Sequence, residues 1–297
     1  MSDTTLSPTE GIRINKMSKF FWTDFFAKTL IRLLSKLPSF FYNTLAELGG
    51  RVLDRKKGKI ARAALKLTQP NITPEQCDAI ARKSSTYSLT YLLSLPRLRK
   101  TPYQLHNLDV MKEAVAEDRG AVVISLHMGP PDIGTLAAAE HGFPANTLIG
   151  AGKQSPLANS LGRHALEQAG IDFIQRGDPT AVFKSIKQKK MVFLYSDLRS
   201  REMPVTFFGQ ETSAPATGVM TAQLLKAPIL FHYCTMKNGE WQLHFERFEP
   251  ELTGSHKSDA ANNLQRLIHK MEEVISQHPE LWVWHYDRFK LKKKLNN

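Results

Sequence analysis

From residue 120 onward, short apolar runs alternate with stretches of helical periodicity. Runs of β-branched and aromatic residues are typical of buried strands, whereas apolar residues at steps of three to four indicate helices. The pattern predicts buried strands at 120–127, 146–152, 171–176, 191–197 and 228–234, a more exposed strand at 241–250, and a last short strand at 281–287. It predicts helices at 131–141, 156–170, 179–188, 214–227 and 258–279. This alternation predicts an α/β fold with a mostly parallel central sheet flanked by helices.

The chain before residue 100 has a helical pattern only. In 18–47, aromatic residues and leucines recur at helical spacing opposite charged residues, and Pro38 should interrupt the helix. Such a helix suits a lipid interface, and packing on the protein's own core is the alternative. A dense basic run with helical periodicity follows at 51–66, and Thr73 before Pro74 indicates the start of a further helix. We therefore expect a helical N-terminal extension before the sheet.

Composition narrows the classes of partner. Lys and Arg outnumber Asp and Glu by 40 to 28, a formal net charge of +12, which favours anionic partners such as lipid, nucleic acid or an acidic carrier protein. No nucleic-acid recognition motif accompanies the charge, so we expect no nucleic-acid partner. The two cysteines form no ligand cluster, and we expect neither a metal nor a cofactor. No apolar run approaches the ~20 residues that span a bilayer, which predicts peripheral or monotopic attachment to a membrane.

The first predicted strand ends at His127, and Asp132 follows after the turn Gly129-Pro130-Pro131. In open α/β sheets ligands bind at the carboxyl ends of the strands. A strand–turn–helix junction allows the two side chains to converge, and a carboxylate on one imidazole nitrogen leaves the other free as a base. The pair therefore predicts a general base, His127, with Asp132 as its orienting residue, although H-x4-D also occurs by chance as a strand-end histidine and a helix-capping aspartate.

A second block, Gly170-Ile171-Asp172-Phe173-Ile174-Gln175-Arg176, follows in order. Together, H-x4-D and this G-x-x-F-I-x-R block resemble the glycerolipid and lysophospholipid acyltransferase superfamily. The wider layout over about residues 50–290, including LYSD at 194–197 and ELWVWHYDRFK at the C-terminal end, is similar to the lipid A late acyltransferases. The chain departs from that family in having Asp132 where Glu is more frequent, Leu198 after Asp197, and Tyr286-Asp287-Arg288 in place of a basic pair after the histidine.

The pattern along the chain predicts a flexible N-terminus at 1–17, a helical membrane-associating extension at 18–100, a catalytic domain at 101–290 and a basic tail at 291–297. The resemblance implies that this domain transfers an acyl group from a carrier-protein thioester to a hydroxyl (or hydroxyacyl) group of lipid A, at the cytoplasmic face of the inner membrane. His127 would deprotonate the acceptor for direct attack on the thioester, with no covalent enzyme intermediate.

Four further residues are candidates for substrate binding. Arg176 suits an oxyanion or a phosphate on the acceptor, Lys153 and backbone amides near Gly129 are other oxyanion donors, and Asp197 and Arg199 end a strand on the same edge of the sheet. Structural salt bridges are the alternative for Asp197 and Arg199.

Two rival functions stay open at the level of sequence. One branch related to the late acyltransferases transfers glycine from a carrier protein to lipid A and confers resistance to polymyxin, a cationic antimicrobial peptide. The other alternative is a non-catalytic lipid-binding protein at the membrane surface, which would explain the charge and the amphipathic helix but not the two ordered blocks.

Overall fold

The computed structural model describes residues 22–150 and 156–291. A helical segment at 22–34 precedes the labelled elements. The N-terminal region continues with α2 (Ser39–Thr68), α3 (Pro74–Ser94) and the 3-10 helix η1 (Leu95–Lys100). The rest of the chain comprises β1 (Tyr103–His106), α4 (Leu108–Ala116), β2 (Ala121–Ser125), α5 (Asp132–Glu140), β3 (Ala145–Ile149), α6 (Pro156–Ala169), β4 (Asp172–Gln175), α7 (Pro179–Lys187), β5 (Met191–Tyr195), β6 (Met203–Phe207), β7 (Gln210–Ala214), α8 (Thr217–Leu225), β8 (Ile229–Lys237), β9 (Glu240–Phe248), α9 (His256–Gln277) and η2 (Pro279–Leu281).

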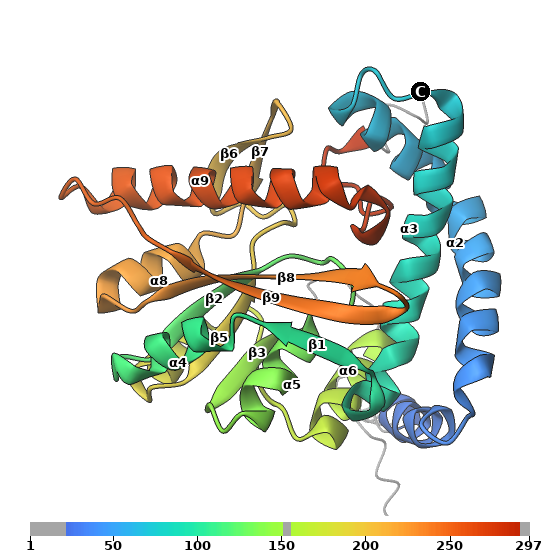
Figure 1. Cartoon of the computed structure of the whole chain (residues 1–297), viewed down its shortest axis with the longest axis horizontal. Helices are drawn as coiled ribbons and strands as arrows, with labels where there is room; N and C mark the ends of the chain where they lie inside the picture. The colour runs from blue at the N-terminus through green and yellow to red at the C-terminus, as the bar shows by residue number, and fades with distance from the viewer. Residues whose placement is uncertain (1–21, 151–155, 292–297) are drawn as a thin grey trace, which may run out of the picture.

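Seven strands form one sheet in the order β1-β9-β8-β2-β5-β3-β4. The strands β8, β2, β5, β3 and β4 run parallel, and β9 pairs antiparallel with β8 and parallel with β1. Helices α8 and α9 lie on one face of this sheet, and α4 and α5 lie on the other (Figure 1). Strands β2 and β5 at the centre have almost no exposed residues, as expected for a parallel sheet covered on both faces. The predicted α/β fold with a mostly parallel sheet is confirmed.

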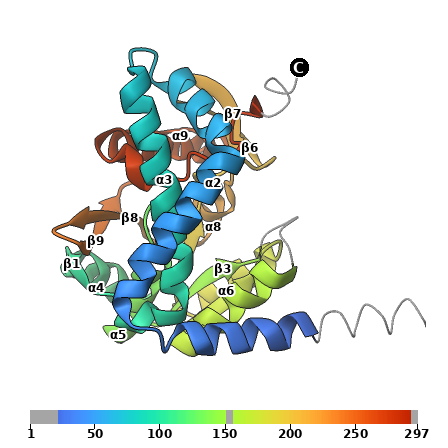
Figure 2. The same ribbon diagram turned by 90° about the vertical axis from the view of Figure 1, so that its right-hand side faces the viewer.

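The N-terminal helices stand across one end of the sheet. Helices α2 and α3 pack side by side at the end toward which β8 points, and segment 22–34 lies at an angle to α2 (Figures 1 and 2). The predicted break at Pro38 is confirmed, since α2 begins at the next residue. Helix α3 begins with a capping box in which Thr73 Oγ1 accepts from the amide of Gln76 and Gln76 Oε1 accepts from the amide of Thr73. The position of these helices at the end of the sheet places α3 over the carboxyl ends of the parallel strands (Figure 1).

Two sequence-based expectations were wrong. Residues 281–287 form no strand but a series of turns after η2, with a single bridge between Trp282 and Met128. The apolar side chains there, Trp282 and Trp284, are buried by tertiary packing rather than by sheet pairing. Strand β9 is also mostly buried, because it lies between β8 and β1.

The hairpin β6–β7 was not predicted. Its strands are joined by Phe208 and Gly209, whose φ angles of 49° and 68° fit the tight two-residue turns that match the twist of a hairpin. A phenylalanine in that conformation is uncommon, so the turn has no strong sequence signal.

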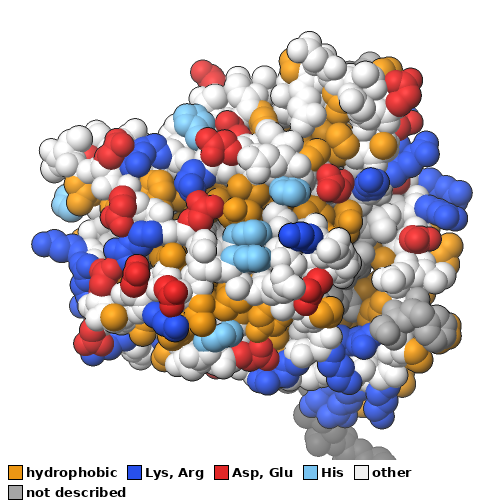
Figure 3. Space-filling model, in the orientation of Figure 1, with side chains coloured by type: hydrophobic (Ala, Val, Ile, Leu, Met, Phe, Trp, Pro, Cys, Tyr) orange, Lys and Arg blue, Asp and Glu red, His pale blue; other side chains and the backbone are white. Residues whose placement is uncertain are grey.

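None of the described helices combines the length and the hydropathy needed to cross a membrane. On the face in Figure 3, Lys and Arg side chains gather at the lower right, over the N-terminal helices. Exposed basic residues of this region include Lys28, Arg32 and Lys36.

A buried histidine lies beneath the start of α5. His232 on β8 is fully buried, its Nδ1 lies 3.0 Å from Ser125 Oγ, and burial together with the charge of His244 lowers its pKa to about 3. The imidazole is therefore neutral at physiological pH. Gly134 lies directly above it, where an added Cβ would be 2.4 Å from His232 Nε2. The close approach of α5 to the sheet therefore requires a glycine at position 134.

We predict opposite effects for two helical Gly→Ala substitutions. Gly134→Ala should lower the free energy of unfolding by about 1–3 kcal/mol, because the new methyl group overpacks against His232. Gly162→Ala in α6 should raise it by about 0.5–1 kcal/mol, since its Cβ would meet Ile149 at an ordinary 3.6 Å and alanine favours a helix. Urea denaturation measures both, and equal effects of the two substitutions would contradict the packing described.

Candidate active site

The register of the two central strands places His127 opposite Asp197. Ser125 at the end of β2 is the partner of Tyr195 at the end of β5. Continuing both chains by two residues brings His127 and Asp197 together at the carboxyl edge of the sheet, where α/β proteins bind ligands. The two residues are 70 positions apart in the chain and adjacent in space.

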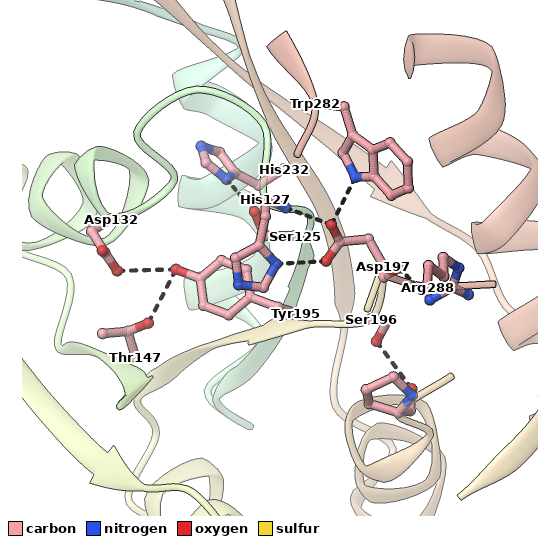
Figure 4. A network of polar contacts seen from close by, with 11 residues as sticks. Ser125, His127, Asp132, Thr147, Tyr195, Ser196, Asp197, His232, Trp282 and Arg288 are labelled. Atoms are coloured by element: carbon pink, nitrogen blue, oxygen red, sulfur yellow. Dashed lines mark hydrogen bonds and ion pairs between the residues drawn. The ribbon is translucent and has the colours of Figure 1, made fainter. Parts of the chain in front are cut away.

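Asp197 holds His127 through two hydrogen bonds. Its Oδ1 lies 2.8 Å from His127 Nδ1, and its Oδ2 accepts from the backbone amide of His127 at 2.8 Å. Oδ2 also accepts from Trp282 Nε1 at 2.9 Å, and the backbone carbonyl of Asp197 accepts from the guanidinium of Arg288 (Figure 4). Because Asp197 is fully buried and each of its oxygens has a donor, the carboxylate is fixed in place.

The electrostatics of the pair agree with this geometry. Burial raises the pKa of Asp197, but the charge of His127 and the hydrogen bonds to it outweigh burial and lower the pKa below its usual range. An ionised carboxylate only accepts hydrogen bonds, so His127 Nδ1 carries the proton and Nε2 is the free nitrogen of the neutral ring. Burial also lowers the pKa of His127, but the Asp197 carboxylate, with a smaller contribution from Asp132, raises it above its ordinary value.

Asp132 has other partners. Its Oδ2 accepts from the Tyr91 hydroxyl at 2.7 Å and its Oδ1 from the Tyr195 hydroxyl at 3.0 Å. Among the described residues no hydrogen bond joins Asp132 to His127, so the expectation that Asp132 orients the imidazole was wrong, and Asp197 does so instead. Asp132 acts on His127 only through its charge, which is one of the influences that raise the pKa of the imidazole. Burial raises the pKa of Asp132 itself, which its hydrogen bonds to the two tyrosines oppose.

His127, Asp132 and Arg176 line one cavity of ≈ 580 Å³, within the range of about 300–1,000 Å³ typical of small-molecule sites. Its apolar lining comes from α3, η1, β3, α6, α7 and β5 and the residues that follow them, and comprises Leu92, Leu95, Leu148, Ile149, Leu166, Val182, Leu194 and Leu198. The Tyr195 ring packs 4.7 Å from the His127 ring, measured between centroids. The site thus combines a half-exposed base with a guanidinium and an extended apolar wall.

The other candidates have different places. Arg176 is close enough for its charge to lower the pKa of His127. Asp197 is buried behind His127, so it acts on the imidazole and does not line the cavity. Arg199 lines a separate cavity and not this one, which contradicts its expected place beside the base. Lys153 lies outside the described residues.

The backbone amides near Gly129 already have acceptors. The amide of Met128 donates to Leu126, that of Gly129 donates to the carbonyl of Leu281 at 3.3 Å, and that of His127 donates to Asp197. Of the oxyanion donors expected from the sequence, Arg176 is therefore the one among the described residues that lines the cavity without an acceptor already assigned to it. Within the described ranges, no group of three His, Cys, Asp or Glu side chains is arranged to hold a metal ion.

Four site residues were missed in the sequence, namely Tyr91, Tyr195, Trp282 and Arg288. All four come from segments distant from His127 in the sequence, and although Tyr195, Trp282 and Arg288 lie in motifs that carry the family resemblance, none of them was assigned a role. The aromatic-basic segment at 280–290 was noted, but nothing in its pattern indicates that an indole and a guanidinium meet the same aspartate.

Comparison with known protein families gives one match. Residues 15–291 match the family model described as bacterial lipid A biosynthesis acyltransferase. The comparison with curated proteins finds no match to the chain.

We predict that two substitutions lower the pKa of His127 by different amounts. Asp197→Asn should lower it, because the negative charge that favours the imidazolium is lost, and Asp132→Asn should lower it by a smaller amount. An NMR titration of the imidazole measures the change, with Asp118→Asn, an exposed aspartate paired with Lys189, as the control that leaves it unaltered. A larger shift in Asp132→Asn than in Asp197→Asn would contradict the assignment of the orienting residue.

Proposed function

The chain belongs to the bacterial lipid A biosynthesis acyltransferase family, and from this we propose that it moves an acyl group from a carrier-protein thioester to a hydroxyl group of a lipid A-type glycolipid. Family membership makes it an acyltransferase that acts on lipid A. The observation that supports the finer proposal is the His127–Asp197 pair, which leaves His127 Nε2 facing the cavity lined by Arg176 and apolar side chains.

In the proposed reaction, His127 Nε2 takes the proton of the acceptor hydroxyl as its oxygen attacks the thioester carbonyl. The C–O bond forms, and the tetrahedral intermediate collapses with cleavage of the C–S bond. His127 returns the proton to the sulfur, so the carrier protein leaves as a thiol. Asp197 stabilises the imidazolium that exists between these two proton transfers. The electron pairs and the proton balance without a covalent enzyme intermediate.

Asp132 and Arg176 support the same step. Asp132 adds a second negative charge near the imidazolium and holds the hydroxyls of Tyr91 and Tyr195 at the cavity wall. Arg176 supplies the positive charge that an oxyanion, or a phosphate on the acceptor, requires. We propose catalytic roles for His127 and Asp132 and a substrate-binding role for Arg176, while Asp197 positions the base.

The apolar wall supports a fatty acyl donor. Eight leucine, isoleucine and valine side chains line the cavity, and burial of a methylene group stabilises a complex by about 0.8 kcal/mol. A glycyl group has no chain to place against such a wall. We therefore propose fatty acyl transfer in preference to glycyl transfer and polymyxin resistance.

The N-terminal helices support attachment to a membrane surface. In segment 22–34, Ala27 and Ile31 are buried against the protein, whereas Phe25, Phe26 and Leu33 are between 55% and 61% exposed. Asp24, by contrast, faces inward and pairs with Arg163 and His164 of α6. The ion pairs of Asp24 hold this helix against the protein while its outward face is apolar and has cations nearby. Such a face suits an anionic lipid interface. We propose that this face binds the cytoplasmic side of the inner membrane.

We predict that His127→Ala and Asp132→Ala each reduce transfer at least ~100-fold, because positioned acid–base groups contribute 10²–10⁴ in rate. Single-turnover transfer from a labelled acyl carrier protein to the lipid acceptor measures the effect. His141→Ala, at the exposed C-terminal end of α5, is the control and should retain full activity. Near-normal turnover in a folded His127→Ala protein would exclude the mechanism.

The nature of the acyl group is tested with two donors. The protein is incubated with lipid A precursor and either a fatty acyl or a glycyl carrier-protein thioester, and the lipid is analysed by mass spectrometry. We expect a mass gain with the fatty acyl donor only. A gain with the glycyl donor alone would support the glycyltransferase alternative, and no acyl release from either donor would support a non-catalytic lipid-binding protein.

A further inference from the structure

A second cavity of ≈ 620 Å³ lies between the hairpin β6–β7, helix α9 and the segment after η2. Among the described residues, it shares no lining residue with the cavity that contains His127. Its polar lining includes Arg199, Arg288, Lys290, Thr212, Glu211 and Gln265. Three of these residues are cationic and one is acidic, so the cavity has an excess of positive charge.

Arg288 lacks an ion-pair partner within the described part of the chain. It is 1% exposed, its guanidinium donates one hydrogen bond to the backbone carbonyl of Asp197, and it stacks 4.3 Å from the centroid of Phe207. Its Nε and its second terminal nitrogen, Nη2, have no hydrogen-bond partner. Burial lowers its pKa to about 10, against the charge of Asp197, so the group stays cationic at neutral pH.

The neighbouring carboxylates are already engaged. Both carboxylate oxygens of Asp197 accept from His127, and Oδ2 also accepts from Trp282. Glu272 Oε1 accepts from the backbone amide of Phe208 at 2.6 Å. A buried guanidinium with open donors and no carboxylate is costly in free energy unless an anion compensates it.

Two more buried donors around the same cavity have no partner in the described structure. They are Arg199 Nε, at the start of the loop after β5, and Thr212 Oγ1 on β7. Arg288, Arg199 and Thr212 thus come from three separate segments to line one cavity, and each has a buried donor without a partner in the described structure. Buried polar atoms without partners are rare in folded proteins, and four of them around one cavity indicate a ligand that supplies several acceptor oxygens.

We propose that this second cavity binds a phosphoryl group through Arg199, Arg288, Thr212 and Lys290. A phosphoryl group offers several acceptor oxygens and matches the planar donor arrangement of guanidinium side chains. Glu211, on the same wall, restricts how much negative charge the cavity accepts. The group comes either from free phosphate or from a phospholipid headgroup.

The position of the cavity connects it to the base. Arg288 lies on the side of Asp197 opposite His127 (Figure 4), so an anion there would sit behind the residue that orients the imidazole. Binding at this cavity does not depend on the proposed acyl transfer, and it is measured without any acyl donor.

The test is a titration of the full chain with inorganic phosphate at constant ionic strength and, separately, with short-chain phosphatidic acid below its micelle concentration. Isothermal titration calorimetry follows both. Arg199→Gln should weaken binding about tenfold or more, as expected for the loss of one charge-assisted hydrogen bond. Arg201→Gln removes the same charge from the same loop outside the cavity and is the matched control, with unchanged affinity.

Thr212→Val is a second variant that keeps the shape of the side chain. It should weaken binding without lowering the free energy of unfolding, because the hydroxyl it removes has no partner in the unliganded protein. If inorganic phosphate binds and its affinity depends on Arg199 and Thr212, the cavity is a site for free phosphate. If only phosphatidic acid binds in this way, the cavity is a site for a phospholipid headgroup. Absence of binding for both ligands, or equal affinity in Arg199→Gln, Thr212→Val and Arg201→Gln, would overturn the proposal.

Discussion

The hydrogen bond between His127 Nδ1 and Asp197 organises this part of the molecule. It depends on the parallel register of β2 and β5, which brings the residues after both strands to the same edge of the sheet. Three donors stabilise the ionised Asp197 in its buried place, namely the backbone amide of His127, its imidazole Nδ1 and the indole of Trp282. A buried carboxylate without such donors is costly in free energy. The pair therefore depends on the C-terminal segment, in which Trp282 donates to the carboxylate and Arg288 to the backbone carbonyl of Asp197.

This requirement explains why distant segments meet at the site. Tyr91 on α3 binds Asp132, and Ser84 on the same helix donates to the carbonyl of Trp282. The N-terminal helices therefore form part of the cavity wall and also help to hold the segment that carries Trp282. Their outer surface keeps aromatic side chains exposed. The same helices connect the proposed membrane surface with the proposed reaction centre.

The sequence predicted those features that depend on local pattern. Buried strands such as β2 and β5 are dense in β-branched and aromatic residues, Pro38 lies at the break between two helices, and Thr73 caps the start of α3. Each of these effects acts within a few residues. The turns after η2 were mistaken for a strand, because two buried tryptophans give the same apolar signal in either structure. The hairpin β6–β7 was missed because its turn contains Phe208 at a positive φ. Phenylalanine rarely adopts that conformation, so the sequence gives no signal for the turn.

The site residues were likewise predictable where they depend on local pattern, and not where they depend on which strands pair. His127 was found because a strand end is a local feature, and Arg176 because it ends a second ordered block. Asp132 was chosen as the orienting residue because it is five positions away, yet the pairing of two strands brought Asp197 from 70 positions away. Which strands become neighbours depends on the whole fold, and a single sequence does not reveal it. Arg199 lines another cavity, although its neighbour Leu198 lines the cavity that contains His127, and the sequence does not show on which side of the chain each side chain lies.

The central claim is that Asp197 fixes the imidazole with its proton on Nδ1 and leaves Nε2 as the base. The most direct measurement is the ¹⁵N NMR spectrum of the labelled histidine ring of His127, recorded above its pKa, in the wild-type protein and in Asp197→Asn. We predict a protonated Nδ1 and an unprotonated Nε2 in the wild-type protein, with loss of this preference when the carboxylate is removed. A ring protonated on Nε2 in the wild-type protein would contradict the account, because the nitrogen that faces the cavity could then not accept a proton.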